Sequence, residues 1–242
     1  MEACVSQAAL PKKQAIVVHS GGMDSSICLA EACRLYGPDS VLSLSFSYGQ
    51  RHAEELLRAR AIAEAFGASH VVLDISCLRQ ITRNALTEHS LDISHEAGEA
   101  PNTLVEGRNG LMARLAAIHA KSLGAHVIYM GVIEVEEANS GYRDCSRLYM
   151  DKMQDILRMD LGLPDFEIRT PLVKMTKAQT MAYADALGVL PFLLETSISC
   201  YRGIPGAGCR DCPACVLRNE GIRTYLTQHP ELRTQVSWVS DI

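Results

Sequence analysis

The sequence predicts an α/β fold, a doubly wound parallel sheet of five strands, followed by a metal-bound helical segment near the C-terminal end. Short β-branched runs alternate with amphipathic stretches of helical length, and glycines stand where those helices should end. Four of the nine cysteines lie between residues 200 and 215. Strands that alternate with helices form parallel sheets covered on both faces, so ligands should bind at the carboxyl ends of the strands.

Each element is predicted from an apolar run or an apolar periodicity. The expected strands are residues 14–19, 41–46, 70–75, 126–132 and 166–169. The expected helices are residues 24–35, 51–66, 109–123, 144–160 and 177–187, with a further helix at 212–228. A glycine near each of the first five helices marks its end, because glycine adopts positive φ at little cost: Gly37, Gly67, Gly124, Gly162 and Gly188.

Composition limits the class of protein. The chain has 242 residues, 48% of them apolar, and a formal net charge of −5 at pH 7. This predicts one main domain at 1–187 and a segment at 188–242 packed on it. No apolar stretch reaches the about 20 residues that cross a bilayer, and residues 1–13 lack the apolar centre of a signal peptide, so we expect a cytoplasmic protein without a membrane partner. The acidic balance argues against nucleic acid and leaves a small phosphate-bearing ligand open.

A glycine- and serine-rich turn follows the first expected strand and opens the first expected helix. Glycines let the backbone approach a ligand, serines add hydroxyl donors, and a helix N-terminus attracts anions. Neither the G-x-x-x-x-G-K-[ST] pattern nor G-x-G-x-x-G fits this turn. The two interpretations are an anion-binding loop and a plain turn whose helix is capped by Asp24. The turn consists of Ser20, Gly21, Gly22, Met23, Asp24, Ser25 and Ser26.

The cysteine cluster has the spacing Cys200-x8-Cys209-x2-Cys212-x2-Cys215. Four thiolates complete a tetrahedral Zn²⁺ site without an open position, so the ion would stabilise the fold and take no part in chemistry. Arginines at 202, 210 and 218 would offset the negative charge of the thiolates. An iron–sulfur cluster and a disulfide pair are the alternatives.

The Ser20 to Ser26 turn is similar to the pyrophosphate loop (PP-loop) of the ATP-pyrophosphatase superfamily. With the other motifs, nearly the whole chain resembles one family within it, the 7-cyano-7-deazaguanine (preQ0) synthases, and the chain is identified as QueC-like. The supporting motifs are Tyr48-Gly49-Gln50-Arg51-His52, Pro101-Asn102-Thr103, Gly107-Arg108-Asn109, Ser140-Gly141-Tyr142-Arg143-Asp144-Cys145, Thr170-Pro171-Leu172 with Lys177, and Ser199-Cys200-Tyr201-Arg202-Gly203.

The resemblance implies a Rossmann-like PP-loop domain, a structural zinc ion and commonly a homodimer. It also implies an ATP-dependent carbon–nitrogen ligase of queuosine biosynthesis that uses Mg²⁺. Such an enzyme adenylates the carboxylate of 7-carboxy-7-deazaguanine and releases pyrophosphate, and ammonia then displaces AMP to give the amide. A second adenylation converts the amide into the nitrile preQ0.

The resemblance also assigns roles to residues of this chain. The turn, Ser20 to Ser26, would hold ATP. The catalytic set would be Asp24, Ser25, Arg108 and Lys177. The substrate would be bound by Tyr48, Gln50, Arg51, His52, Arg108, Asn109, Tyr142 and Asp144.

Each role has a structural alternative. Arg108 opens a helix whose Leu111, Leu115 and Ile118 are expected to face the core, and it could be a solvated arginine at a helix start. Lys177 could be an exposed surface lysine. Arg51 and His52 could belong to the polar face of a helix, together with Glu54 and Glu55. Asp144 could cap the helix that follows it. Histidines 19, 70, 119 and 126 are expected to be packed in strand and helix faces.

Several positions depart from the family pattern. Glu106 and Arg143 replace prolines, and Ser146 replaces arginine. Gln179 replaces glutamate, and the loop 133–140 is longer. These departures leave open a paralogue, of the kind found in antiphage systems, that attaches the deazaguanine acyl group to an amine of an acceptor protein. In such a paralogue the longer loop, with Glu134, Glu136 and Glu137, would shape the opening through which the acceptor protein reaches the active site. A non-catalytic nucleotide-binding module is the remaining alternative.

Overall fold

The computed structural model describes residues 12–49, 54–81, 105–135 and 142–242. The predictions for Gln50, Arg51 and His52 lie outside these residues, as do those for the motif at 101–103 and for Ser140 and Gly141. Most of the loop 133–140 lies outside them as well.

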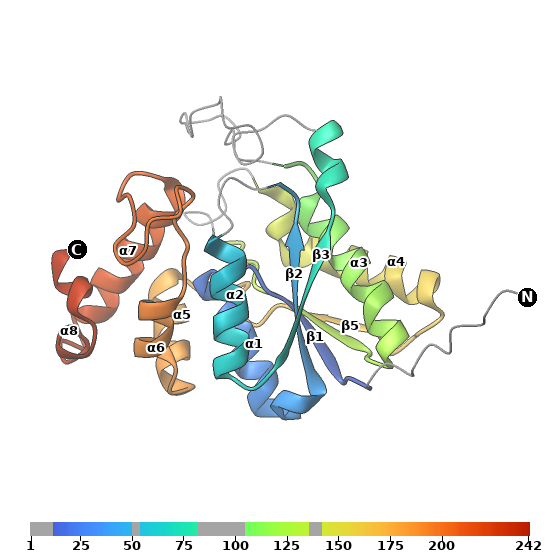
Figure 1. The fold of residues 1–242 in the computed structure, drawn as a ribbon, viewed down its shortest axis with the longest axis horizontal. Coiled ribbons are helices and arrows are strands. Elements are labelled where there is room, and N and C mark those ends of the chain that lie inside the picture. Colours follow the sequence, from blue (N-terminus) through green and yellow to red (C-terminus); the bar gives the residue numbers. More distant parts are fainter. Residues whose placement is uncertain (1–11, 50–53, 82–104, 136–141) are drawn as a thin grey trace, which may run out of the picture.

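The described residues contain one five-stranded parallel sheet with the strand order β3-β2-β1-β4-β5 (Figure 1). The five predicted strands are confirmed, each within two residues of its predicted limits. The order reverses between β1 and β4, which is the switch point where α/β sheets bind ligands. The strands are β1 (Ala15–Val18), β2 (Val41–Ser47), β3 (Ser69–Asp74), β4 (Val127–Met130) and β5 (Glu167–Arg169).

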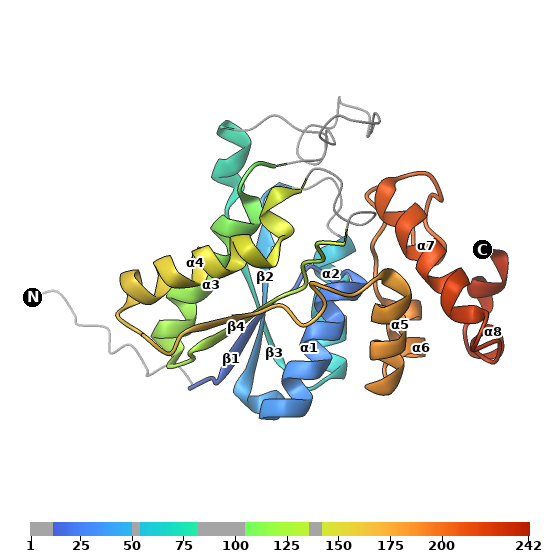
Figure 2. The ribbon, with the colours of Figure 1, turned by 180° about the vertical axis from the view of Figure 1, so that it is seen from behind.

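Helices cover both faces of the sheet, which confirms the doubly wound prediction (Figures 1 and 2). One core lies between the sheet and α3 with α4, and the other lies between the sheet and α1, α2, α6 and α7. The helices are α1 (Met23–Tyr36), α2 (Glu54–Ala65), α3 (Arg108–Leu123), α4 (Arg147–Leu161), α5 (Lys177–Ala186), α6 (Leu190–Thr196), α7 (Pro213–Leu226) and α8 (Leu232–Gln235).

Two helix predictions are wrong in detail. The helix expected at 144–160 is preceded by a 3-10 turn, Arg143–Cys145, and α4 begins only at Arg147, because the Ser146 hydroxyl caps it by accepting from the Tyr149 N–H at 3.2 Å. Of the three residues expected on the buried face of α3, Leu111 and Leu115 pack against the core and Ile118 does not. Ile118 is 53% exposed, whereas alanines such as Ala116 and Ala120 face the sheet, because small side chains let the helix pack closely on it. The sequence analysis did not predict α6.

Residues 188–242 pack on the main sheet domain through α6 and α7, and α7 contacts α5. Leu190 and Leu193 of α6 and Ile222 of α7 belong to the same buried core as Ile27 of α1. The two helices α5 and α7 lie so close that a Cβ at Gly221 would come within 2.4 Å of the Lys177 Cβ. The predicted domain boundary at residue 187 stays a prediction.

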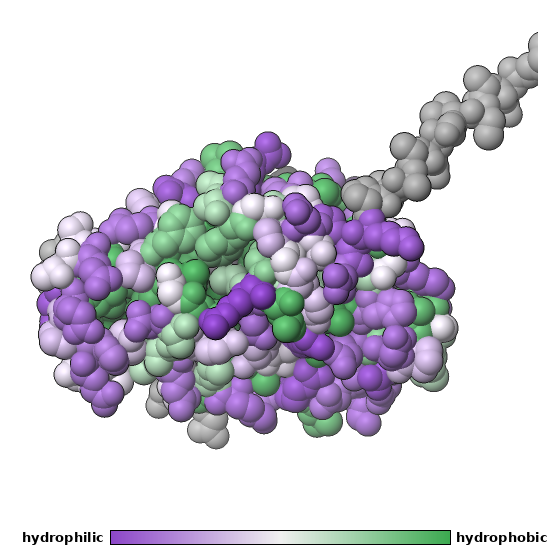
Figure 3. Space-filling model, turned by 90° about the horizontal axis from the view of Figure 1, so that it is seen from below, coloured by the Kyte–Doolittle hydropathy of each residue, from purple (hydrophilic) through white to green (hydrophobic). Residues whose placement is uncertain are grey.

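The surface seen from below is mainly hydrophilic, with hydrophobic residues gathered in a hollow near the middle of that face (Figure 3). A search of the described residues finds no helix with the length and the apolar character that crossing a membrane requires.

The two glycines after β1 differ in their surroundings. Gly21 has φ +82°, and a Cβ there would lie 2.3 Å from the Glu55 carbonyl oxygen of α2. Gly22 has φ −79°, and its nearest neighbour would be the rotatable Ser20 hydroxyl at 3.2 Å. The turn therefore packs on α2 through Gly21, and only Gly21 requires a residue without a side chain.

We predict that Gly21→Ala destabilises the protein far more than Gly22→Ala. Positive φ and a clash with backbone together should cost roughly 2–4 kcal/mol at Gly21, whereas Gly22→Ala should cost less than about 1 kcal/mol. Urea unfolding of the two variants measures the difference. Equal losses of stability would contradict the packing of the turn on α2.

Candidate active site and metal centre

The serines of the turn form a hydrogen-bonded network around the Gly22 carbonyl. The Ser25 hydroxyl accepts from the Ser20 N–H at 3.1 Å and donates to the Gly22 carbonyl at 3.1 Å. The Ser26 hydroxyl also donates to that carbonyl, at 2.8 Å. Gly22 is the N-cap of α1, and the Asp24 carboxylate pairs with Lys177 and with no N–H of the helix, so the alternative in which Asp24 caps the helix is wrong. Asp24 lies in the first helical turn, where its carboxylate remains available to other partners.

Asp24 and Lys177 form an ion pair beside the turn, although 153 residues separate them in the sequence. The Lys177 Nζ lies 2.5 Å from Asp24 Oδ2, and the lysine side chain is only 13% exposed. The alternative of an exposed surface lysine is therefore wrong. Asp24 Oδ1 is buried and has no hydrogen-bond partner among the described residues. A buried carboxylate oxygen without a partner fits a divalent cation such as Mg²⁺, which binds oxygen ligands.

A capping box fixes Lys177 at the start of α5. The Thr176 hydroxyl accepts from the Gln179 N–H at 3.2 Å, and the Gln179 side chain accepts from the Thr176 N–H at 2.8 Å. Glutamine thus makes the reciprocal contact that glutamate makes in such boxes. The departure from the family pattern at residue 179 leaves the position of Lys177 unchanged.

Arg108 stands at the start of α3 among aromatic side chains. Its guanidinium lies 5.5 Å from the centre of the Tyr48 ring, and Nη1 donates to the Tyr48 hydroxyl at 3.4 Å. Tyr142 and Tyr201 are close enough to interact electrostatically with it. Stacking on an aromatic ring leaves the planar edge of a guanidinium free to bind a carboxylate or phosphate in a bidentate manner.

Asp144 caps α3 and does not cap the helix that follows it. Its Oδ2 accepts from the Asn109 N–H at 3.0 Å, and its side chain is buried. The Asn109 amide donates to the Cys145 sulfur at 3.3 Å. Burial, and then the charge of Asp144, raises the pKa of Cys145 to about 12, which favours the thiol over the thiolate at neutral pH. The 3-10 turn 143–145 therefore holds the start of α3, where Arg108 lies.

Two further residues belong to this region and were missed as candidates. Glu55 lies in the first turn of α2, and burial raises its pKa to about 7 although the nearby Arg108 opposes the shift. Tyr201 follows Cys200 directly, and its pKa is raised well above the usual value by burial and by Tyr142. The sequence offers a signal only for Tyr201, which lies inside the Ser199 to Gly203 motif.

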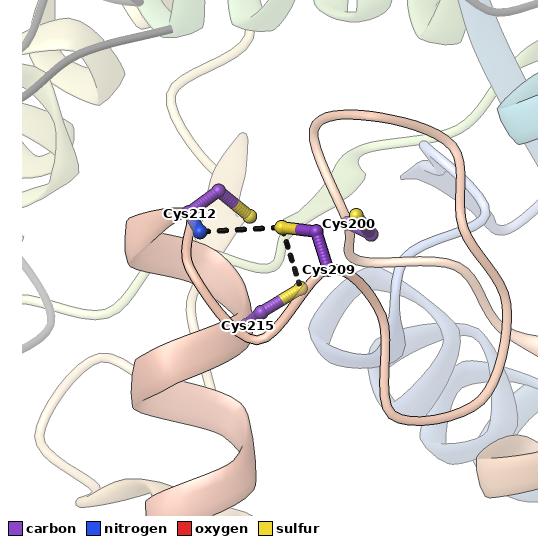
Figure 4. Close-up of side chains that lie close together, drawn as sticks. All are labelled: Cys200, Cys209, Cys212 and Cys215. Atoms are coloured by element: carbon purple, nitrogen blue, oxygen red, sulfur yellow. Dashed lines mark hydrogen bonds between the residues drawn. The ribbon is translucent and has the colours of Figure 1, made fainter.

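The four clustered cysteines converge on one point (Figure 4). Their Sγ atoms all lie within 4.8 Å of one another, and those of Cys209 and Cys215 are 3.9 Å apart. One tetrahedral ion with metal–sulfur bonds of about 2.3 Å separates its sulfurs by roughly 3.8 Å. A four-iron cluster places an iron atom under each thiolate and holds the sulfurs farther apart. The cluster fits one ion, and the cysteines of the described residues are all free of disulfides.

Arg218 is the arginine that supports this cluster from within the protein. It is 4% exposed, stacks 5.4 Å from the Trp238 ring and donates to the Gly206 carbonyl at 2.6 Å. Burial lowers its pKa and the cysteine thiolates oppose that shift, so their charges stabilise one another. Arg202 instead pairs with Asp211 at the surface, and Arg210 is exposed.

The chain leading to the first cysteine touches the turn after β1. The Ile198 N–H donates to the Gly21 carbonyl at 3.0 Å, and the Ser199 hydroxyl lies 3.5 Å from the Met23 N–H. Cys200 follows immediately. The candidate metal centre and the candidate anion-binding loop are therefore joined by three residues.

Solved structures resemble this chain at low sequence identity. NMN synthetase from Francisella tularensis is 13% identical, with a TM-score of 0.49 over 93% of this chain and 87% of that one. The NH3-dependent NAD synthetase from Campylobacter jejuni, in complex with nitrate, is 13% identical, with a TM-score of 0.49 over 95% and 82%. The U34-tRNA thiolase NcsA from Methanococcus maripaludis, with its [4Fe-4S] cluster, is 14% identical, with a TM-score of 0.47 over 96% and 72%.

A family model gives the assignment. The model of the queuosine biosynthesis protein QueC matches residues 14–226, which include every strand, the serine-rich turn, Arg108, Lys177 and all four clustered cysteines. The resemblance inferred from the motifs is confirmed. The chain belongs to the QueC family of PP-loop enzymes, which are ATP-using ligases.

Proposed function

We propose that the chain uses Mg-ATP to adenylate the carboxylate of 7-carboxy-7-deazaguanine and that ammonia displaces AMP. The carboxylate oxygen attacks the α-phosphorus, and pyrophosphate leaves. Attack of ammonia on the acyl carbon then breaks the bond to AMP and gives the amide. In a second cycle the amide oxygen is adenylated, and loss of AMP and of both amide protons gives the nitrile. The oxygen of a carboxylate or an amide is a poor leaving group. Each adenylation makes that oxygen part of AMP, which is a good leaving group.

The ion pair between Asp24 and Lys177 is the observation that carries this proposal. It holds a largely buried cation beside the loop, where the departing pyrophosphate would gain negative charge. The unpartnered Asp24 Oδ1 suits Mg²⁺, which would offset the charge of the phosphates. The N–H groups at the start of α1 add an anion site. We assign binding of ATP to Ser20 through Ser26, and stabilisation of the leaving pyrophosphate to Lys177.

We assign binding of the acceptor substrate to the region of Arg108. Its guanidinium is suited to the carboxylate that reacts, and the surrounding tyrosines suit a flat heterocycle. Three departures from the family pattern lie close to Arg108 or Asp144 in the sequence, and none of these three residues is buried. Glu106 and Arg143 are exposed, and Ser146 serves as a helix cap. This favours ammonia as the acceptor over a protein amine.

We assign a structural zinc ion to the cysteine cluster. Four thiolates leave no position open for substrate, and the buried Arg218 offsets part of their charge. The ion would hold the segment that carries Ile198 and Ser199 against the loop.

We predict that Lys177→Met lowers pyrophosphate release at least about 100-fold, because it removes the cation that stabilises the leaving group. The matched control is Lys174→Met, because Lys174 is 71% exposed and pairs at the surface with Glu134. Formation of AMP and pyrophosphate is measured with 7-carboxy-7-deazaguanine present. Release of ADP and phosphate by the unmodified protein would contradict the assignment.

Metal analysis should find one zinc ion per chain. Cys212→Ser should lose it and lower the melting temperature, because the ion's binding energy contributes to folding. Cys77→Ser, which changes an exposed cysteine outside the cluster, should keep both the ion and the stability. Iron with visible charge-transfer absorption would overturn the zinc assignment.

The acceptor is tested by mass spectrometry of the products. Incubation with ATP, 7-carboxy-7-deazaguanine and ammonium should give the amide and then preQ0, with two AMP per nitrile. A parallel reaction replaces ammonium by a polypeptide with a free N-terminus. An amide-linked adduct on the polypeptide, with no nitrile in the ammonium reaction, would instead indicate the paralogue.

A further inference from the structure

A line of buried hydrogen bonds crosses the sheet beneath the loop. His19 follows β1, is 1% exposed, and lies between Ser43 of β2 and Ser26 of α1. Its Nδ1 is 2.9 Å from the Ser43 hydroxyl, and its Nε2 is 3.0 Å from the Ser26 hydroxyl. Ser43 in turn lies 2.9 Å from Nδ1 of His70 on β3. At the other end, Ser26 is 2.8 Å from the Gly22 carbonyl oxygen.

Each hydroxyl has one proton to donate, so the hydrogen bonds along this line can all be donated in one direction or all in the other. In the first, His70 donates through Nδ1 to Ser43, Ser43 donates to His19 Nδ1, His19 donates through Nε2 to Ser26, and Ser26 donates to Gly22. In the second, every donor and acceptor is exchanged, and Ser26 donates to His19 and not to the Gly22 carbonyl.

The free end of the line decides between these directions. Nε2 of His70 is buried and has no hydrogen-bond partner among the described residues. The first direction leaves a bare lone pair at that atom. The second leaves an N–H donor there, which is the rarer and more costly defect, and it also loses the bond to Gly22. The first direction is therefore favoured, and it makes His19 the Nε2–H tautomer.

His19 stays neutral in this arrangement. Burial, with a smaller contribution from His70, lowers the pKa of His19 to about 3. A neutral imidazole has one donor and one acceptor, and the line uses both.

The Gly22 carbonyl is the point where this line meets the loop. In a trans peptide the C=O and the following N–H point in opposite directions. The bonds from the Ser25 and Ser26 hydroxyls hold the carbonyl toward the interior of α1. The Met23 N–H is thereby directed to the opposite side, where it donates to the Ser199 hydroxyl at 3.5 Å, a long hydrogen bond that a bound anion would replace.

We propose that His19 is a positioning residue for the pyrophosphate loop: it fixes the Ser26 hydroxyl on the Gly22 carbonyl and so aims the Met23 N–H at a bound diphosphate. The proposal rests on the proposed function in one respect, the binding of the ATP phosphates by the loop. His19 touches no substrate and acts through Ser26.

The first test reads the tautomer without any reaction. Nitrogen-15 NMR of the imidazole of His19, identified by its loss in His19→Gln, should show Nε2 protonated and Nδ1 bare from pH 6 to 8. A protonated Nδ1, or titration of His19 near its ordinary pKa, would overturn the proposal. Because no nucleotide is present, this result is independent of whether the chain adenylates a deazaguanine.

The second test measures binding of inorganic pyrophosphate by calorimetry. His19→Leu and Ser26→Ala should each weaken it about tenfold, which is the loss of one aligned hydrogen-bond donor. His19→Gln keeps an N–H for Ser26 and should stay within about threefold. Ser43→Ala breaks the line on the far side of His19, so it should lower the melting temperature and leave pyrophosphate affinity unchanged. Equal affinity in all four folded variants would show a purely structural role and overturn the proposal.

Discussion

The backbone hydrogen bond from the Ile198 N–H to the Gly21 carbonyl ties the loop after β1 to the chain that leads into the cysteine cluster. The loop after β1 has no side-chain cap of its own, and the residues that support it come from the far end of the chain. Cys200, two residues after Ile198, belongs to the cysteine cluster, and Gly221 of α7 packs against Lys177. An ion bound by the four thiolates would restrain all of these contacts at once. In the proposed arrangement the metal centre would act on the geometry of the active site and would take no part in the chemistry.

The same arrangement explains how a lysine can be kept largely buried beside the candidate anion-binding loop. A buried ammonium group without a partner would be costly or would lose its proton. Asp24 supplies the opposite charge at 2.5 Å, and the capping box of Thr176 and Gln179 fixes the direction from which Lys177 approaches. In the proposed reaction the phosphates join this pair, so the desolvation of Lys177 is already compensated before ATP binds. Such preorganisation lowers the reorganisation required during the reaction.

Local patterns predicted the strands, the serine-rich turn and the four cysteines, because each is encoded within a few neighbouring residues. The remaining features of the site depend on tertiary contacts, which local patterns do not encode. The choice between Asp144 as the cap of α3 or of α4 depends on where two distant segments meet, and the small side chains of Ala116 and Ala120, not the larger Ile118, define the buried face of α3. Glu55 looks like any acidic residue at a helix start, and only the fold brings it near Arg108. Lys177 could be assigned from resemblance alone, since its partner lies 153 residues away.

The departures from the family pattern are informative because of what the substituted residues do. Gln179 still completes a capping box, since an amide oxygen accepts the same N–H as a carboxylate, and Ser146 gives α4 a good N-cap. Arg143 lies in the turn whose neighbour Asp144 fixes α3, yet its own side chain is exposed. These substitutions either maintain the contacts that position Arg108 and Lys177 or do not involve those contacts. Tyr48, Asn109 and Asp144, which surround Arg108, keep the residue types of the family motifs, so in the proposed reaction the described departures leave the contacts of Arg108 in place.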